Sequence, residues 1–233
     1  MNLESEKILK ILKLKGVKYL CHANTVTTAA AYLKNGKLLS RESVSKSGDY
    51  QTVQKSDEID KKQGIFDYIF LDTVDIHNRA RRRNEYGPVL FVFKLDLLSD
   101  SKFKKVRITK TNPIHWDGRE SEDKRYYISS EDLENGFRFG DFDASLMFED
   151  IQGLPLKDYL IGLILDDPKI KVNGLDLTEN AENVLKASWK SGPLKNIKLD
   201  VVKRKCTKAN CKCHWNYSTD IAWVNTSFLL RCD

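Results

Sequence analysis

The chain has 233 residues, of which 41% are hydrophobic, 31% charged and 10% aromatic, and its net charge is +6. This composition is that of a folded globular protein and excludes a disordered chain, a collagen-like fibre and a small disulfide scaffold. Its apolar stretches are far shorter than the roughly 18–20 residues of a membrane span, and residues 1–18 carry no small-residue cleavage site, so we expect a cytoplasmic protein with no membrane partner.

The charge is distributed unevenly along the chain. Basic side chains predominate in residues 1–116 and 168–233, and acidic ones predominate in residues 117–167. A basic first half favours a polyanionic or phosphate-bearing ligand, although a net charge of this size is equally typical of a well-solvated surface. Charge alone therefore does not choose between these interpretations.

The first part of the chain predicts a helix, a strand and a second helix. Apolar residues at helical spacing among lysines predict an amphipathic helix over 4–15. Residues 17–21 read as a short strand that runs directly into His22. An alanine-rich segment over 25–34 predicts the second helix, with Gly36 as its stop.

The middle of the chain is richer in strands. Residues 43–63 are polar and dense in Ser, Asp, Gln and Lys, so we expect a long surface loop there. The two clearest strands, rich in Phe, Ile, Val and Tyr, are 65–71 and 88–98. Weaker strand patterns occupy 106–109, 126–128 and 144–148.

The last part mixes both kinds of element. Periodicity does not separate a strand from a short helix over 156–165, whereas 177–188 predicts a capped helix. Residues 197–230 show strand-like patterning that is broken by 203–215. Strands and helices interleave without a regular βαβ rhythm, so the sequence predicts a single domain of the α+β class over residues 1–233.

The most informative local pattern follows the first predicted strand. His22 ends that strand, Asn24 and Thr25 follow in a polar turn, and the helix leads to a Gly-Lys-Leu-Leu-Ser-Arg segment that ends at Arg41. A histidine supplies a directional donor or acceptor, and a helix N-terminus favours anionic oxygens, so the pattern is suited to reading phosphate and ribose. An ordinary strand–helix turn with a satisfied histidine has the same appearance.

This corner resembles the start of the NAD-binding half of ADP-ribosyltransferases, and most of all the DarT-type nucleic-acid ADP-ribosyltransferases. The similarity continues through 64–71, which is similar to the Asp-Tyr-containing strand of the family, and extends to 144–155, which resembles the strand carrying the family's catalytic acid. It covers residues 18–168. Residues 169–233 would then add a C-terminal helix and strands with a Cys-rich hairpin.

The resemblance implies an ADP-ribosyltransferase-like split β-sheet core with flanking helices, which holds NAD in a cleft. It implies transfer of ADP-ribose to a nucleic acid or a protein with release of nicotinamide, a role as a toxin or phage-defence factor, and an inhibitory antitoxin partner. His22 would contact the nicotinamide-side ribose, and Asn24 and Thr25 the carboxamide or a hydroxyl. Arg41 would contact the phosphates, and Tyr68 the nicotinamide ring.

The resemblance also implies a catalytic carboxylate. Glu149 would stabilise the positive charge that builds on the ribose when the bond to nicotinamide breaks. The family's acid sits early in its strand, whereas Glu149 comes late, so Asp143 is a rival for this role. A solvent-facing carboxylate in an acidic segment explains Glu149 equally well.

A different reading centres on Asp72 and Asp75, directly after an apolar strand. Two carboxylates at a strand end with His77 nearby are suited to Mg²⁺, and Glu85 or Asp96 would add a ligand. This alternative predicts a metal-dependent nuclease. Aspartates are also common in turns at strand ends, and this explains the pattern without a metal.

Four arginines, Arg79, Arg81, Arg82 and Arg83, follow this segment. The planar guanidinium group is suited to bidentate phosphate contacts, so a nucleic acid is the natural polyanion. The cluster therefore predicts the acceptor site of a transferase or, as a further alternative, a non-catalytic nucleic-acid-binding module. A solvated charged loop is the simpler explanation.

Three of the five cysteines lie close together near the C-terminus. Cys206, Cys211, Cys213 and the following His214 offer enough ligands for tetrahedral Zn²⁺. Their spacing departs from the usual pair of cysteines separated by two residues, and a disulfide is disfavoured in a cytosolic chain. The sequence therefore favours an exposed Cys-bearing hairpin with no metal, and zinc remains the alternative.

Overall fold

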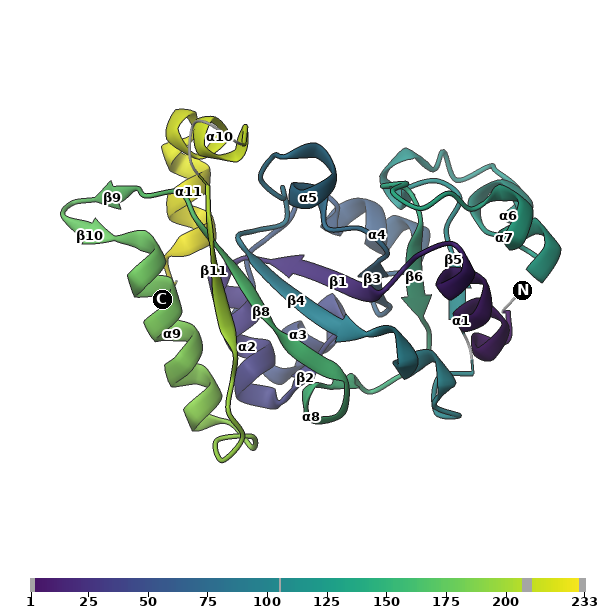
Figure 1. The fold of residues 1–233 in the computed structure, drawn as a ribbon, viewed down its shortest axis with the longest axis horizontal. Helices are drawn as coiled ribbons and strands as arrows, with labels where there is room; N and C mark the ends of the chain where they lie inside the picture. Colours follow the sequence, from purple (N-terminus) through teal and green to yellow (C-terminus); the bar gives the residue numbers. More distant parts are fainter. Residues whose placement is uncertain (1–2, 105, 207–210, 231–233) are drawn as a thin grey trace.

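The computed structural model describes residues 3–104, 106–206 and 211–230. At its centre is a seven-stranded sheet with the strand order β11-β8-β4-β1-β3-β6-β5 (Figure 1). Its strands are β1 (Tyr19–Asn24), β3 (Ile69–Asp72), β4 (Val89–Lys94), β5 (Val106–Ile108), β6 (Ser145–Phe148), β8 (Leu160–Asp167) and β11 (Val201–Lys205). Neighbouring strands are antiparallel except β8 and β11, which are parallel. This mixed sheet with its helices confirms the predicted α+β class.

Two small antiparallel sheets lie outside the central one. One joins β2 (Lys37–Leu38) to β7 (Leu154–Pro155), and the other joins β9 (Lys171–Val172) to β10 (Leu175–Asp176). The first connects the segment after the second helix to the chain after β6 and so closes one end of the core. Leu38 and Leu154 are paired in it, and both are fully buried.

The longer helices pack around the sheet. Helices α2 (Val26–Asn35) and α9 (Leu177–Ser191) lie against each other, and α9 also contacts β8, whereas α1 (Ser5–Leu14) lies at the opposite end of the sheet beside η1 (Leu95–Ser99) and α7 (Ser130–Gly136) (Figure 1). Helix α11 (Ile221–Phe228) packs on α10 (Cys213–Thr219), α2 and α9. The shorter helices are α3 (Arg41–Ser47), α4 (Asp57–Gln63), α5 (Ile76–Ala80), η2 (Pro113–His115), α6 (Glu122–Arg125) and α8 (Leu156–Tyr159).

The predicted N-terminal helices, and the strand between them, are confirmed within a few residues. Helix α2 begins where the hydroxyl of Thr25 accepts a hydrogen bond from the Thr28 amide, and it ends at Gly36, whose φ of 65° is the left-handed conformation that glycine tolerates. Its Tyr32 packs edge-on to Phe91 of β4, with the ring centroids 5.8 Å apart. Tyr32 therefore anchors the helix against the sheet.

Strand β1 pairs very differently with its two neighbours. It matches β4 along its whole length, from Tyr19 opposite Lys94 to Asn24 opposite Val89. Against β3, in the part of the chain that the structure describes, it is registered at a single pair, Cys21 with Asp72. The sheet therefore splits between β1 and β3 beyond this pair, and the split positions the candidate site.

The expectation of a long surface loop over 43–63 is wrong, because most of this segment forms α3 and α4. Ser40 caps α3 by accepting a hydrogen bond from the Ser43 amide, and Val44 is fully buried. The ion pair between Arg41 and Asp57 then ties the two helices together. Buried ion pairing and capping thus order a segment whose polar composition indicated a loop.

The C-terminal strand pattern is also wrong beyond β11. Tyr217, Val224 and Phe228 are fully buried on α10 and α11, where they recur at helical spacing. The weak strand over 126–128 is reduced to an isolated bridge between Thr109 and Tyr126, because Tyr126 packs its ring on Trp116 instead.

Two other expectations change in detail. The segment 156–165 contains both alternatives, because α8 leads directly into β8. The strand expected over 88–98 stops at Lys94 and continues as η1. Among the described residues, no helix combines the length and apolarity that crossing a bilayer requires.

Candidate functional site

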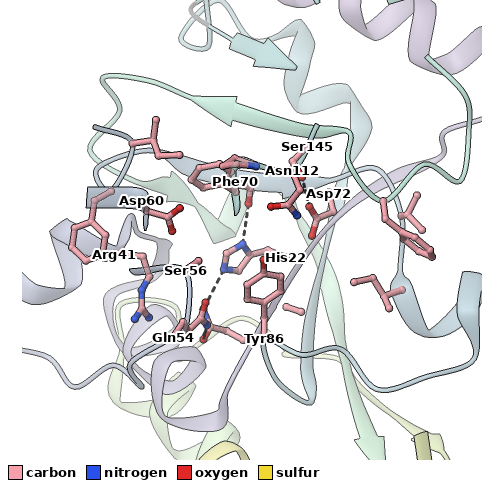
Figure 2. Close-up of a pocket in the computed structure, with 18 of the residues that line it drawn as sticks. His22, Arg41, Gln54, Ser56, Asp60, Phe70, Asp72, Tyr86, Asn112 and Ser145 are labelled. Carbon is pink, nitrogen blue, oxygen red and sulfur yellow. Dashed lines mark hydrogen bonds between the residues drawn. The ribbon is translucent and has the colours of Figure 1, made fainter. Parts of the chain in front are cut away.

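A pocket opens where β1 and β3 separate (Figure 2). Polar residues from several parts of the chain line it: His22 and Asn24 of β1, Asp72 of β3, Ser145 of β6, Arg41, Gln54, Ser56 and Asp60 from the segment around α3 and α4, and Asn112 and Asp141 from two loops. Its apolar wall includes aromatic side chains, namely Phe66, Phe70, Tyr86 and Phe142. Aromatic surface with a few convergent polar groups is the usual make-up of a small-molecule site.

His22 lies at the split, where its side chain, rather than the backbone of β1, bonds to the backbone of β3. Its Nδ1 lies 2.9 Å from the carbonyl oxygen of Phe70 and donates a hydrogen bond to it (Figure 2). Nε2 therefore carries a lone pair and accepts from the Asn24 side-chain amide at 3.4 Å. Burial lowers the pKa of His22 to about 4, so the ring is neutral at physiological pH.

Hydrogen bonds to its neighbours fix the orientation of the Asn24 side-chain amide. Its Oδ1 accepts hydrogen bonds from the Thr25 amide at 2.9 Å and from the Gln54 side chain at 3.1 Å. Gly87 presses against the same corner with φ 149°, and a Cβ there would lie 2.1 Å from the Asn24 carbonyl. Only glycine fits this close approach.

Arg41 reaches the pocket from the start of α3. Its Nε and Nη2 form a two-pronged ion pair with Asp57, at 2.9 and 2.6 Å, and Nη2 also donates to the Thr52 carbonyl. Its Nη1 is buried and has no hydrogen-bond partner among the described residues. A buried N–H without a partner is costly, so this face of the guanidinium is suited to an anionic ligand.

Two carboxyl groups in the pocket have raised pKa values. Burial raises the pKa of Asp72 to about 6, although the Ser145 hydroxyl, which donates to it at 2.6 Å, acts in the opposite direction. Burial, together with the charge of Asp57, likewise raises the pKa of Asp60 to about 6. Such carboxyls change their charge near neutral pH, and this behaviour is common at functional sites.

The structure brings His22, Asn24 and Arg41 together and leaves the other predicted NAD contacts outside the pocket wall. Thr25 caps α2, and its hydroxyl lies 2.7 Å from that of Thr52. The Tyr68 hydroxyl donates to Glu149 at 2.8 Å. These two residues are next to Ile69 and Phe148, which form the last pair of the β3–β6 ladder. Tyr68 directly precedes β3 and Glu149 directly follows β6, so this hydrogen bond lies just beyond the paired strands, and neither residue lines the pocket.

Asp143 does not line the pocket either. Its carbonyl oxygen accepts a hydrogen bond from the Thr109 hydroxyl, and the residues of the same loop that reach the pocket are Asp141 and Phe142. The proposed catalytic acids, Glu149 and Asp143, thus flank the site, whereas Asp72 and Asp60 lie in it. Sequence reasoning missed Asp60 because it falls in the segment expected to be a loop.

The carboxylates of the metal-nuclease alternative do not converge. Asp75 caps α5 and forms an ion pair with Arg204 at 2.5 Å, in a second hollow beside Tyr19. Glu85 faces Arg82 on the surface, and Asp96 is paired with Lys13. Among the described residues these carboxylates belong to no cluster of three or more potential metal ligands.

The four arginines divide into two groups. Arg79, Arg81 and Arg82 are exposed, and Arg79 lies over the Phe142 ring at the pocket wall. Arg83 is turned into the fold, where it pairs with Asp220 at 3.0 Å and stacks on Trp223. The first three therefore lie on the surface, and the fourth anchors the segment to the C-terminal helices.

Only the ends of the expected Cys-bearing hairpin are described, and there Cys206 and Cys213 are buried rather than exposed. Cys206 directly follows β11 and is buried, Cys213 is buried at the start of α10, and Cys211 is bonded to Cys213. Residues 207–210 lie outside the described part of the chain. His214 points away from the sulfur atoms, and its Nδ1 donates to the Pro168 carbonyl at 2.9 Å. Both buried cysteines belong to the main hydrophobic core.

Comparison with protein-family models and with curated protein sequences found no match to this chain. The chemistry of the site therefore rests on its own residues and on their geometry.

Proposed function

We propose that the pocket binds NAD⁺ and that the protein transfers ADP-ribose from it to a nucleic-acid acceptor, with release of nicotinamide. One observation carries the proposal: His22, Arg41 and Asp72, which are far apart in the sequence, line a single aromatic pocket at the split between β1 and β3. A dinucleotide needs a cation for its pyrophosphate, polar groups for its ribose hydroxyls and flat surfaces for its rings, and this pocket offers all three.

The binding roles follow from the hydrogen bonds that the pocket leaves open. The free face of the Arg41 guanidinium would receive the pyrophosphate, because its Nη1 has no partner among the described residues. The neutral ring of His22 suits a site for the positively charged nicotinamide, since an imidazolium would repel it. Phe70 and Tyr86 would offer their faces to the nicotinamide or adenine ring.

Within this proposal, Asp72 is the catalytic carboxylate. Breaking the bond between ribose and nicotinamide builds positive charge on the ribose, and a nearby carboxylate stabilises that charge. The resemblance places the acid early in its strand, where this chain has Ser145, and the Ser145 hydroxyl is bonded to Asp72 on the adjacent strand. Asp72 thus offers a carboxylate at the place that Glu149 and Asp143 do not reach.

A nucleic-acid acceptor is favoured over a protein by the exposed arginines. Arg79, Arg81 and Arg82 follow Ile76, which lines the pocket, so a bound phosphate backbone would pass close to the reacting ribose. Binding through these side chains should weaken steeply as the salt concentration rises.

The proposal is tested by measuring thermal stability with NAD⁺ and nicotinamide release with single-stranded DNA or RNA. We expect NAD⁺ to raise the melting temperature, and His22→Ala to abolish the shift. Asp72→Asn should keep the shift and slow nicotinamide release by about 100-fold or more. Glu149→Gln, the matched control, should behave like the unchanged protein.

Each contrary result has its own meaning. Failure of NAD⁺ to stabilise the protein, together with no nicotinamide release on any acceptor, would overturn the proposal. Salt-sensitive nucleic-acid binding under those conditions would point instead to the non-catalytic binding module. Loss of activity in Glu149→Gln but not in Asp72→Asn would move the catalytic role to Glu149.

A further inference from the structure

A second group of reactive side chains lies away from the pocket, between α5 and the C-terminal helices. It consists of His77 on α5, Cys206 after β11, and Cys211 and Cys213 at the start of α10. Their ligand atoms all lie within 4.8 Å of one another, and among the described residues this is the one such cluster of potential metal ligands. The sequence separates His77 from Cys206 by 129 positions, so the fold, rather than a local motif, brings them together.

The spacing of these atoms suits a tetrahedral metal ion. His77 Nε2 lies 3.2 Å from the Cys211 sulfur and 3.8 Å from the Cys206 sulfur. Four-coordinate Zn²⁺, with bonds of about 2.3 Å to sulfur and about 2.0 Å to nitrogen, holds its ligand atoms roughly 3.5–3.8 Å apart. We propose that His77, Cys206, Cys211 and Cys213 bind one Zn²⁺ ion when the three cysteines are reduced.

The bond between Cys211 and Cys213 is the competing state of the same sulfurs. A disulfide between residues two apart closes a very short loop, and so restricts the unfolded chain little. The disulfide also does not account for the position of His77 and Cys206 beside it. A cytosolic chain keeps its thiols reduced, and in that state all four ligands are present.

Zinc binding to the reduced cysteines changes no oxidation state. Zn²⁺ displaces one proton from each of the three thiols, and forms three bonds to sulfur and one to the neutral ring of His77. Where Cys211 and Cys213 are already bonded, a thiol reductant must first return two electrons and two protons.

Backbone contacts hold the ligands in place independently of a metal. The Lys212 amide donates to the Arg81 carbonyl at 2.7 Å, which fixes the turn between Cys211 and Cys213 against the end of α5. The Cys213 amide donates to the Cys211 sulfur at 3.2 Å, a hydrogen bond that would stabilise a thiolate ligand. The Asp75 side chain accepts from the His77 amide and so caps the helix that carries the imidazole.

Four protein ligands close the coordination sphere, so the role of the ion is structural. It would fasten α5 to β11 and α10, and α5 begins at Ile76, which lines the pocket. Zinc would thereby hold the exposed arginines Arg79, Arg81 and Arg82 beside the pocket. This site stands independently of the proposed transferase activity, because none of its ligands lines the pocket.

The test uses the full chain, purified under reducing conditions and supplied with Zn²⁺. Elemental analysis should find about one zinc per chain, and removal by a chelator should lower the melting temperature. Replacement with Co²⁺ should give the visible absorption of a tetrahedral ion with several sulfur ligands. The cobalt spectrum is measured on the unchanged chain, so it remains decisive even if a cysteine variant fails to fold.

Variants separate this ligand set from the one that the sequence suggested. His77→Ala and Cys206→Ser should each weaken zinc binding by about 10-fold or more. His214→Ala is the matched control and should keep one zinc per chain, because His214 donates to Pro168 instead. Absence of zinc and of a cobalt spectrum in the reduced chain, unchanged zinc binding in Cys206→Ser, or a Cys211–Cys213 bond that persists in reductant with Zn²⁺ would overturn the proposal.

Discussion

The Ser145 hydroxyl donates a hydrogen bond of 2.6 Å to Oδ1 of Asp72 across the β3–β6 ladder, where the two residues face each other as a register pair. This contact is the one hydrogen bond that lowers the pKa of Asp72 against the effect of burial. The hydroxyl therefore offsets part of the effect of burial and increases the ionised fraction of the carboxyl near neutral pH. It links the charge state of the pocket to a side chain on a neighbouring strand.

Removing this hydroxyl should raise the pKa of Asp72 further. In Ser145→Ala the carboxyl loses a donor to its charged form, so it should ionise above its present value of about 6. The acidic limb of the pH profile for nicotinamide release should move to higher pH by the same amount. A carboxyl NMR titration of labelled aspartate measures the shift without relying on activity.

Ser145→Thr provides the control, because it keeps the hydroxyl and should keep the titration near pH 6. A titration in Ser145→Ala that stays in place, or moves to lower pH, would show that the hydroxyl does not stabilise the ionised carboxyl. The informative comparison is thus a titration that rises in Ser145→Ala and stays in place in Ser145→Thr.

The raised pKa of Asp72 also predicts how stability depends on pH. The folded protein binds a proton at Asp72 up to about pH 6, whereas the unfolded chain releases it near 3.8, the ordinary pKa of an aspartate. Between these limits the folded state holds more protons than the unfolded one, so this group lowers the free energy of unfolding as pH rises. Above about pH 6 its contribution no longer changes.

Asp72→Asn should therefore be more stable than the unchanged protein at pH 8, and the difference should shrink as the pH falls to about 4. Urea unfolding at several pH values measures it. Asp60 has a similarly raised pKa and remains in the variant, so some of the pH dependence should persist. A difference that grows at low pH would contradict the burial of this carboxyl.

The sequence predicted the elements whose signals are local. The amphipathic spacing of the first helix, the threonine cap and glycine stop of the second, and the aromatic and β-branched runs before Asp72 and after Gly87 all indicated the kind of element observed, although the strand expected over 65–71 begins only at Ile69. The corner at His22 was recognised for the same reason, since a polar turn between a strand and a capped helix is continuous in the sequence.

The sequence could not show which distant side chains meet. Asp60 lies in a polar segment that is ordered by tertiary contacts such as the ion pair between Arg41 and Asp57. His77 lies 129 positions from Cys206, so the adjacent His214 was the natural choice of ligand from spacing alone. In both places a tertiary contact, rather than a local pattern, decides the outcome.

Arg41 should be sensitive even to a substitution that keeps its charge. In Arg41→Lys a single ammonium replaces the planar group, and it cannot hold both oxygens of Asp57 while presenting a free N–H to the pocket. We expect the affinity for ADP-ribose, measured by calorimetry, to fall by about 10-fold or more. Lys34→Arg, at the exposed pair with Asp49, is the control and should leave the affinity unchanged.

A buried ion network joins the sheet to α5. Arg204 of β11 donates to Asp166 at 2.7 Å and to Asp75 at 2.5 Å, and the hydroxyl of Tyr217 reaches the second oxygen of Asp166. Asp75 and Asp166 are buried, with exposed fractions of 4% and 0%. Their two negative charges therefore depend on the single guanidinium between them.

Arg204→Met should lower the free energy of unfolding by about 3–5 kcal/mol, because it leaves two buried carboxylates without their partner. Urea denaturation measures this loss, and Lys198→Met, at the exposed pair with Asp200, should leave the unfolding curve nearly unchanged. Adding Asp75→Asn and Asp166→Asn to Arg204→Met should recover part of the stability, since the uncompensated charges are then gone. Equal stability of Arg204→Met and the triple variant would show that these charges are not what the arginine balances.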